Sequence, residues 1–156
     1  MSKPKVLVVG SLNIDMVLEI ERMPEVGENL FVEKFSMLPG GKGNNQAVAC
    51  ARLGALVSMI GKVGDDEFGE RLLVNLEQEN VDLAFVTRQP LVNTGLAFIF
   101  VDKRGENRLL VAPGANMELS VNDLDNALQL FKVNEFLILQ LEIPQEVVKK
   151  CIEYAH

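Results

Sequence analysis

Apolar residues along this chain form short runs that read as buried strands. Val6–Val9, Leu56–Ile60 and Phe136–Leu141 are almost uninterrupted stretches of aliphatic and aromatic side chains. Runs of this length, without strict alternation, are typical of parallel strands that are covered on both faces. The three runs therefore predict the central strands of one sheet.

Between these runs, apolar residues recur at the spacing of a helix. One helix is predicted after Asp65, which can cap it, and another after Ser120, which with Asp123 resembles a capping pair. A third begins at Pro144, a residue that suits the first helical position. Strands and helices that alternate in this way predict the α/β class, with a doubly wound and mostly parallel sheet.

Two further segments, 16–37 and 96–112, also read as strands, and the second folds back at Asp102–Glu106 as a hairpin. Their alternation is imperfect and exposes aromatic residues on a surface that a small sheet cannot cover alone. The aromatic residues concerned are Phe31, Phe35, Phe98 and Phe100. One interpretation of these segments is that they are ordinary edge strands of the main sheet.

The segment Leu38–Gly54 is the most informative part of the chain. Its glycines give backbone freedom directly before Lys42, Asn44 and Asn45, which begin a helix of small residues. The first turn of a helix offers free N–H groups and a partial positive charge. Small residues at Ala47, Cys50, Ala51 and Gly54 predict a flat helix face that lies close to a sheet.

Two well-known glycine motifs do not fit this segment. A Walker phosphate loop requires Ser or Thr after the Gly-Lys pair, whereas Lys42 is followed by Gly43. A dinucleotide fingerprint requires a glycine where Gln46 stands, and it must directly follow the first strand. The sequence therefore favours a small polar ligand over either nucleotide motif at this loop.

Composition and charge argue against several classes of function. The chain is 48% hydrophobic and 24% charged, which is typical of a globular protein, and its net charge of −7 argues against a nucleic-acid partner. No apolar run approaches the roughly 20 residues that span a bilayer, and no signal-peptide core is present. The only histidine, His156, excludes a multi-histidine metal site. Cys50 and Cys151 lie among apolar neighbours, as buried free thiols do.

Polar residues that suit a sugar follow several predicted strands. Asn13 and Asp15 are two residues apart at the C-terminal end of the first predicted strand, so in extended chain they point the same way. Asp accepts from hydroxyls, and Asn both donates and accepts. Lys42 and Asn45 follow the glycines, and Glu142 follows Phe136–Leu141. The alternatives are a local turn at Asn13, a solvated lysine, and a helix cap at Glu142.

Taken together, these motifs resemble the ribokinase family of carbohydrate kinases, over essentially the whole chain. Lys42 and the run that follows it are most similar to the ribokinases within that family, and Asn44 stands where alanine is more usual. The segments that carry the resemblance are Gly10–Asp15, Pro24–Glu28, Leu38–Gly54, Ile60–Gly69, Asn93–Gly95, Pro113–Asn116 and Gln140–Glu142.

The resemblance implies a kinase that transfers the γ-phosphoryl group of ATP to D-ribose at its 5-hydroxyl, with Mg²⁺ and with a monovalent cation such as K⁺ as a further candidate. It implies that the sugar is held by Asn13, Asp15, Gly41, Lys42, Gly43, Asn45 and Glu142. The family's catalytic base and nucleotide site belong to C-terminal motifs that have no counterpart here, so no catalytic residue, metal site or bound cofactor is assigned to this chain.

The resemblance also implies an organisation. Residues 1–156 correspond to the N-terminal part of the domain, and segments 16–37 and 96–112 to a β-lid over the sugar, which packs on a second subunit's lid. A crossover helix at 144–155 normally leads to another parallel strand, so we expect a truncated or split kinase of the cytoplasm that is inactive alone. The alternatives are a non-catalytic carbohydrate-binding or dimerisation module, or part of another sugar or nucleoside kinase of the family.

Overall fold

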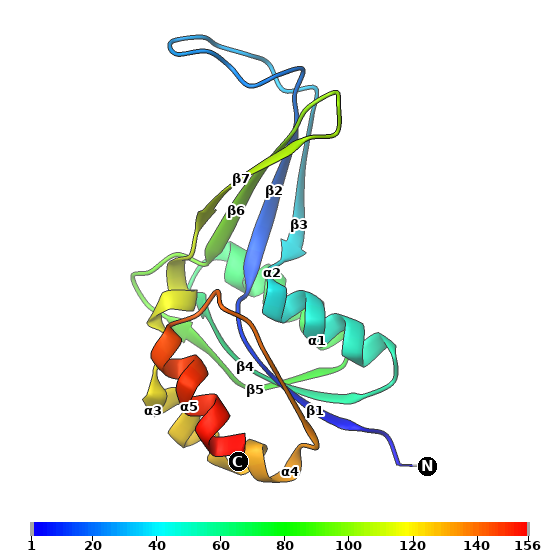
Figure 1. Cartoon of the computed structure of the whole chain (residues 1–156), viewed down its shortest axis with the longest axis vertical. Helices are drawn as coiled ribbons and strands as arrows, with labels where there is room; N and C mark the ends of the chain where they lie inside the picture. The colour runs from blue at the N-terminus through cyan, green and yellow to red at the C-terminus, as the bar shows by residue number, and fades with distance from the viewer. Residues whose placement is uncertain (1, 156) are drawn as a thin grey trace.

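The computed structural model describes residues 2–155, which form an α/β body and a β-lid that rises from it (Figure 1). The body contains a four-stranded sheet in the order β5-β4-β1-β8, and every neighbouring pair is parallel. Its strands are β1 (Lys5–Val9), β4 (Leu56–Gly64), β5 (Val81–Gln89) and β8 (Phe136–Leu139). The predicted fold class is thereby confirmed.

Helices cover both faces of this sheet (Figure 1). The first face carries α1 (Lys42–Arg52) and α2 (Glu67–Gln78), and the second carries α3 (Val121–Asn126), α4 (Leu128–Val133) and α5 (Gln145–Ala155). Successive residues of β1 alternate between the two cores, because strand side chains point to opposite faces. Val6 and Val8 pack with Leu72 on the first face, whereas Leu7 and Val9 belong to the core on the second.

The lid is a separate four-stranded sheet in the order β3-β2-β6-β7. Its strands are β2 (Asn13–Glu19), β3 (Lys34–Gly40), β6 (Gly95–Val101) and β7 (Asn107–Ala112). The interpretation of these segments as edge strands of the main sheet is therefore wrong, and the hairpin at Asp102–Glu106 is confirmed. The lid strands also extend beyond the predicted limits, because pairing continues to Asn13 and Gly40 at the base of the lid.

Several local predictions need correction. Asp66, not Asp65, caps α2, and its side chain accepts from the backbone N–H of Gly69 at 2.8 Å. The capping box of Ser120 and Asp123 is confirmed, but the helix it starts breaks at Ala127 into α3 and α4. Gly54 lies beyond the end of α1 with φ of 95°, so it terminates the helix instead of extending its flat face.

The strand β8 is less covered than its apolar sequence suggests. Phe136 is 57% exposed and Leu141, which lies beyond the end of the strand, is 83% exposed. The cause is topological, because β8 is at the edge of the sheet and pairs only with β1 among the described strands. Both cysteines are free, Cys151 fully buried and Cys50 partly, and burial raises the pKa of the Cys151 thiol to about 12. Within residues 2–155, no helix has the length and apolarity that crossing a membrane requires.

The start of α1 touches the backbone that joins the two sheets. Gly41 caps the helix with φ of 89°, a conformation that favours glycine, and the N–H of Asn44 donates to the carbonyl of Ser11 at 2.9 Å. A Cβ added at Gly43 would lie 2.7 Å from backbone atoms of Gly10 and Ser11. The absence of side chains at these two positions lets the helix reach the junction.

This contact predicts that Gly43→Ala destabilises the protein, although alanine normally favours a helix. We expect a loss of about 1–3 kcal/mol in the free energy of unfolding, because the added methyl group meets backbone that cannot rotate away. Denaturant titration measures the change. Gln78→Ala, an exposed position at the end of α2, is the control and should change stability by no more than about 0.5 kcal/mol. Equal stability of both variants and the parent would contradict the close packing.

Candidate functional site

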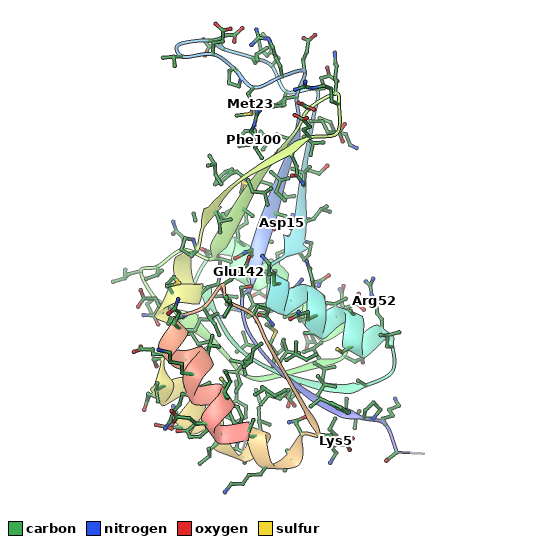
Figure 2. The ribbon with its side chains drawn as sticks, viewed as in Figure 1. Lys5, Asp15, Met23, Arg52, Phe100 and Glu142 are labelled. Carbon is green, nitrogen blue, oxygen red and sulfur yellow. The ribbon has the colours of Figure 1, made fainter. Side chains whose placement is uncertain are left out.

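The polar residues singled out in the sequence meet where the lid joins the body. Figure 2 shows Asp15 at the base of the lid and Glu142 facing the same junction from the loop after β8. A cavity of about 150 Å³ opens between them. It is lined by Asn13, Asp15, Gly41, Lys42, Asn45, Ala97, Ile99, Leu109, Val111 and Glu142.

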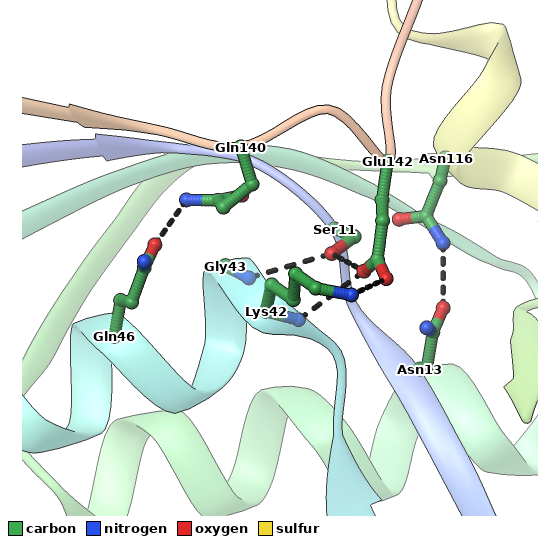
Figure 3. A network of polar contacts seen from close by, with 8 residues as sticks. All are labelled: Ser11, Asn13, Lys42, Gly43, Gln46, Asn116, Gln140 and Glu142. Atoms are coloured by element: carbon green, nitrogen blue, oxygen red, sulfur yellow. Dashed lines mark hydrogen bonds and ion pairs between the residues drawn. The ribbon is translucent and has the colours of Figure 1, made fainter.

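An ion pair between Lys42 and Glu142 crosses this site (Figure 3). The Glu142 carboxylate also accepts from the Ser11 hydroxyl at 2.7 Å and from the backbone N–H of Lys42 at 3.4 Å. Gln46 and Gln140 form a second polar link between α1 and the end of β8 (Figure 3). The loop after β8 is therefore fastened to the first two turns of α1, and Glu142 is held in place before any ligand arrives.

Asn13 is held from the opposite side by a buried asparagine. The Asn116 side-chain amide donates to Asn13 Oδ1 at 2.8 Å (Figure 3). It also donates to the carbonyls of Leu12 and Pro113, while its oxygen accepts from the backbone N–H of Leu12 at 2.8 Å. Every polar atom of the Asn116 side chain is thus used. Because Asn13 Oδ1 is occupied, its Nδ2 remains to donate to a ligand.

Asp15 lies beside these groups on β2, and a glycine makes room for it. A Cβ at Gly40, on the neighbouring strand, would lie 2.2 Å from Asp15 Cγ. Burial and the nearby Glu142 carboxylate raise the pKa of Asp15 above its usual 3.8, and Lys42 only partly offsets them. Burial also acts to raise the pKa of Glu142, but hydrogen bonds from Lys42 and Ser11 outweigh it, so this pKa is lowered.

The structure brings together six of the seven residues predicted to hold a sugar. Asn13, Asp15, Gly41, Lys42, Asn45 and Glu142 line the cavity. Gly43 does not line the cavity, because it is buried against Gly10 and Ser11, where it lets α1 pack closely on this backbone. The prediction that Asn13 and Asp15 end the first strand is also wrong. They begin β2, after a bend that follows β1.

Sequence reasoning missed the residues that complete the site. Asn116 belongs to a segment that carried the family resemblance, but spacing gave no sign that it would reach Asn13. Ser11 likewise showed no signal beyond its place between Gly10 and Asn13. The apolar wall contributed by Ala97, Ile99, Leu109 and Val111 becomes apparent only once β6 and β7 are placed over the body.

The chemistry of this cavity suits a small polyhydroxylated ligand. Two carboxylates accept hydrogen bonds, whereas Lys42 and the amide groups of Asn13 and Asn45 donate them. The aliphatic wall from the lid matches the apolar face of a sugar ring. Within residues 2–155, no group of three or more His, Cys, Asp or Glu side chains is arranged to hold a metal ion.

The chain is similar to known proteins over nearly its whole length. The profile of the pfkB family carbohydrate kinases matches residues 3–156. The chain belongs to this family. The ribokinase of Lactococcus lactis is 44% identical over 156 residues, a match that covers 97% of this chain and 51% of the relative. The deoxyribokinase of Salmonella typhimurium is 39% identical over 149 residues, or 96% of this chain and 49% of the relative.

Solved structures of the family show the same fold. Arabidopsis thaliana ribokinase, complexed with ribose and ATP, matches with a TM-score of 0.86 and 31% identity over 99% of this chain and 50% of its own. Thermotoga maritima ribokinase matches with a TM-score of 0.85 and 35% identity over 97% of this chain and 50% of its own. The chain thus spans about half the length of the relatives it matches.

The raised pKa of Asp15 predicts that Asp15→Asn stabilises the fold at neutral pH. The folded state holds the Asp15 proton more tightly than the unfolded state, so the ionised carboxylate costs stability near pH 7. That cost disappears as the pH falls through the raised pKa and is gone below the unfolded value of about 3.8. The melting temperature of Asp15→Asn should exceed that of the parent at pH 7, and the difference should close toward pH 3.5.

Asp123 provides a matched contrast of opposite sign. Burial raises its pKa, but hydrogen bonds from Ser120 and Lys62 outweigh burial and lower it. Its ionised form therefore stabilises the fold above the unfolded pKa, and this contribution is lost as the pH falls through the lowered value. Asp123→Asn should lower the melting temperature at pH 7 and have less effect in acid. If Asp15→Asn behaves in the same way, Asp15 is a stabilising group and the electrostatic account of the site is wrong.

Proposed function

We propose that this chain is the sugar-binding half of a ribokinase-type kinase that phosphorylates D-ribose at its 5-hydroxyl. The observation that carries the proposal is the gathering of Asn13, Asp15, Lys42, Asn45 and Glu142 around one cavity at the lid junction. Carboxylates and amides at fixed positions suit the neighbouring hydroxyls of a pentose. A relative with 31% identity that is complexed with ribose and ATP supports this choice of substrate.

We assign the roles of the site residues from their chemistry and their places around the cavity. Asp15 accepts from two sugar hydroxyls, and Glu142 accepts from another while its ion pair with Lys42 keeps it ionised. Asn13 and Asn45 donate through their amide groups. Gly41, whose φ of 89° favours glycine, brings backbone without a side chain to the cavity. The sugar is thereby bound and oriented from both the body and the lid.

Phosphoryl transfer depends on positioning and charge neutralisation, and we assign those parts to the other half of a family kinase. The catalytic base, the ATP site, Mg²⁺ and a monovalent cation such as K⁺ belong there, and no cofactor is assigned to this chain. Residues 1–156 are thus the N-terminal part of a kinase of the cytoplasm. Two features support this division. The relatives are about twice as long, and one ribokinase structure is a complex with ADP.

We further propose that the protein dimerises through its lid. The lid face toward the cavity exposes Leu38, Leu109 and Val111, at 53%, 52% and 52%. Leu109 and Val111 line the cavity, and Leu38 pairs with the cavity-lining Asp15. Apolar patches of this kind usually mark an interface, and a twofold contact of lid on lid would cover both copies at once. The expectation that four aromatic residues are exposed is only partly correct: Phe31 and Phe35 are exposed, at 95% and 50%, whereas Phe98 and Phe100 are half-buried. Phe35 and Phe100 both pair with Leu18, which places them on the face of the lid that is turned away from the cavity.

The functional proposal predicts activity only when both halves are present. The purified chain should bind ribose but not phosphorylate it above the level of an Asp15→Ala control, because a positioned base alone contributes about 10²–10⁴ in rate. Mixing it with the unmatched half of Lactococcus lactis ribokinase should restore ATP-dependent phosphorylation. Asp15→Asn should weaken ribose binding several-fold to a hundredfold, because it replaces an acceptor with a mixed group and mispairs a hydroxyl.

Activity of the chain alone would contradict the division of labour between the halves. A chain that binds no pentose, and stays inactive with the second half, would contradict the sugar-kinase proposal itself. Binding of a sugar without activity in any mixture would favour a non-catalytic carbohydrate-binding module.

The dimer proposal is tested by two neighbouring residues of β7. Leu109 lines the cavity-facing side of the lid, whereas Leu110, 65% exposed, points to the opposite side of the sheet. Leu109→Arg should weaken dimerisation at least tenfold in sedimentation equilibrium, because it places a charge in the covered face, and Leu110→Arg should not. A monomeric parent, or a dimer that only Leu110→Arg disrupts, would contradict this interface.

A further inference from the structure

Asn44 is a buried amide in the first turn of α1, directly before the cavity-lining Asn45. Asn44 is 2% exposed, and its Oδ1 atom has no hydrogen-bond partner among the described residues. Its Nδ2 donates to Asn45 Oδ1 at 3.2 Å. Asn44 is anchored on the other side as well, since its backbone N–H donates to the carbonyl of Ser11. The buried side chain of Asn44 thus holds the exposed side chain of Asn45.

Stability does not account for an asparagine at this position. A buried carbonyl oxygen without a donor costs free energy, and asparagine is a poorer helix former than alanine. Side chains at adjacent helix positions also do not normally face each other, so the contact with Asn45 requires a particular rotamer of both residues. The free energy of folding therefore does not explain why this asparagine is buried. Its only side-chain partner among residues 2–155 is Asn45, which points to a role at Asn45.

The contact determines which end of Asn45 a ligand meets. An asparagine side chain has one oxygen that accepts and one nitrogen that donates. Because Asn44 occupies the oxygen of Asn45, the nitrogen is left for the cavity. The carboxylates of Asp15 and Glu142, which share this cavity, accept only. A donor at Asn45 therefore supplies what these two groups cannot give to a sugar oxygen.

We propose that Asn44 is a positioning residue that fixes the Asn45 amide with its nitrogen toward the ligand. Asn44 itself touches no substrate. The ligand consequence rests on the function proposed above, whereas the effect on Asn45 does not. Asn44 raises affinity for a hydroxylated ligand by holding Asn45 in its binding orientation beforehand, at a cost to the stability of α1.

The test compares Asn44→Ala with Asn75→Ala. Asn75 lies on α2 and lines the other side of a groove that also contains Asn44 and Asn45, which makes it a matched asparagine-to-alanine control. We expect Asn44→Ala to lower the NMR order parameter of the Asn45 side-chain amide below about 0.6. Ribose affinity, measured by calorimetry, should fall about three- to tenfold. The melting temperature should stay constant or rise by about 2–4 °C. Asn75→Ala should leave the Asn45 amide and ribose affinity unchanged.

A structural role for Asn44 would give a different result, in which the melting temperature falls and the Asn45 amide stays ordered. That result overturns the proposal. If the parent binds ribose, an Asn44→Ala variant with the same ribose affinity as the parent overturns it too. Asn44→Leu, which is similar in size but can neither donate nor accept, provides a second variant and should also mobilise Asn45. If the parent binds no ribose, the proposed function fails, and the order parameter of the Asn45 amide alone decides the role of Asn44.

Discussion

The close approach of α1 to the backbone between β1 and β2 is the constraint on which the site depends. Gly41 turns the chain into the helix, and Gly43 removes the side chain that would separate the helix from Gly10 and Ser11. Residues 10–12, which include Gly10 and Ser11, also link the two sheets, because β1 ends at Val9 and β2 starts at Asn13. One contact therefore sets the position of Lys42 and Asn45 relative to both the body and the lid.

Charge balance at this junction explains how the site stays ready for a ligand. One lysine faces two carboxylates, and it pairs with Glu142, whose pKa is lowered as a result. Asp15 has no ion-pair partner among residues 2–155, and burial and the Glu142 charge raise its pKa. Unfavourable placement of this kind is common at functional sites, where residues are held for binding and not for stability. In the function proposed above, the hydroxyl groups of a sugar would donate hydrogen bonds to Asp15.

Much of the fold could be predicted from the sequence, because hydrophobic periodicity reports burial directly. The runs at Val6 and Leu56 gave central strands, and the capping box at Ser120 gave a helix start. The strand β5 was missed, since its polar residues interrupt any clear pattern. The strand β8 is less buried than predicted, because an apolar sequence does not show whether a strand is central or at an edge. Asp65 and Asp66 were equally good caps until the backbone placed the second beside Gly69.

Six of the seven predicted site residues lie together, but the support around them depends on long-range contacts that no local pattern encodes. Asn116 reaches Asn13 across 103 positions, and Ser11 reaches Glu142 across 131. The most direct test of the central claim is a titration of the labelled chain with D-ribose, followed residue by residue with NMR. The account predicts saturable shifts centred on Asn13, Asp15, the first turn of α1 and Glu142. Shifts confined to other surfaces, or none at saturating ribose, would contradict it.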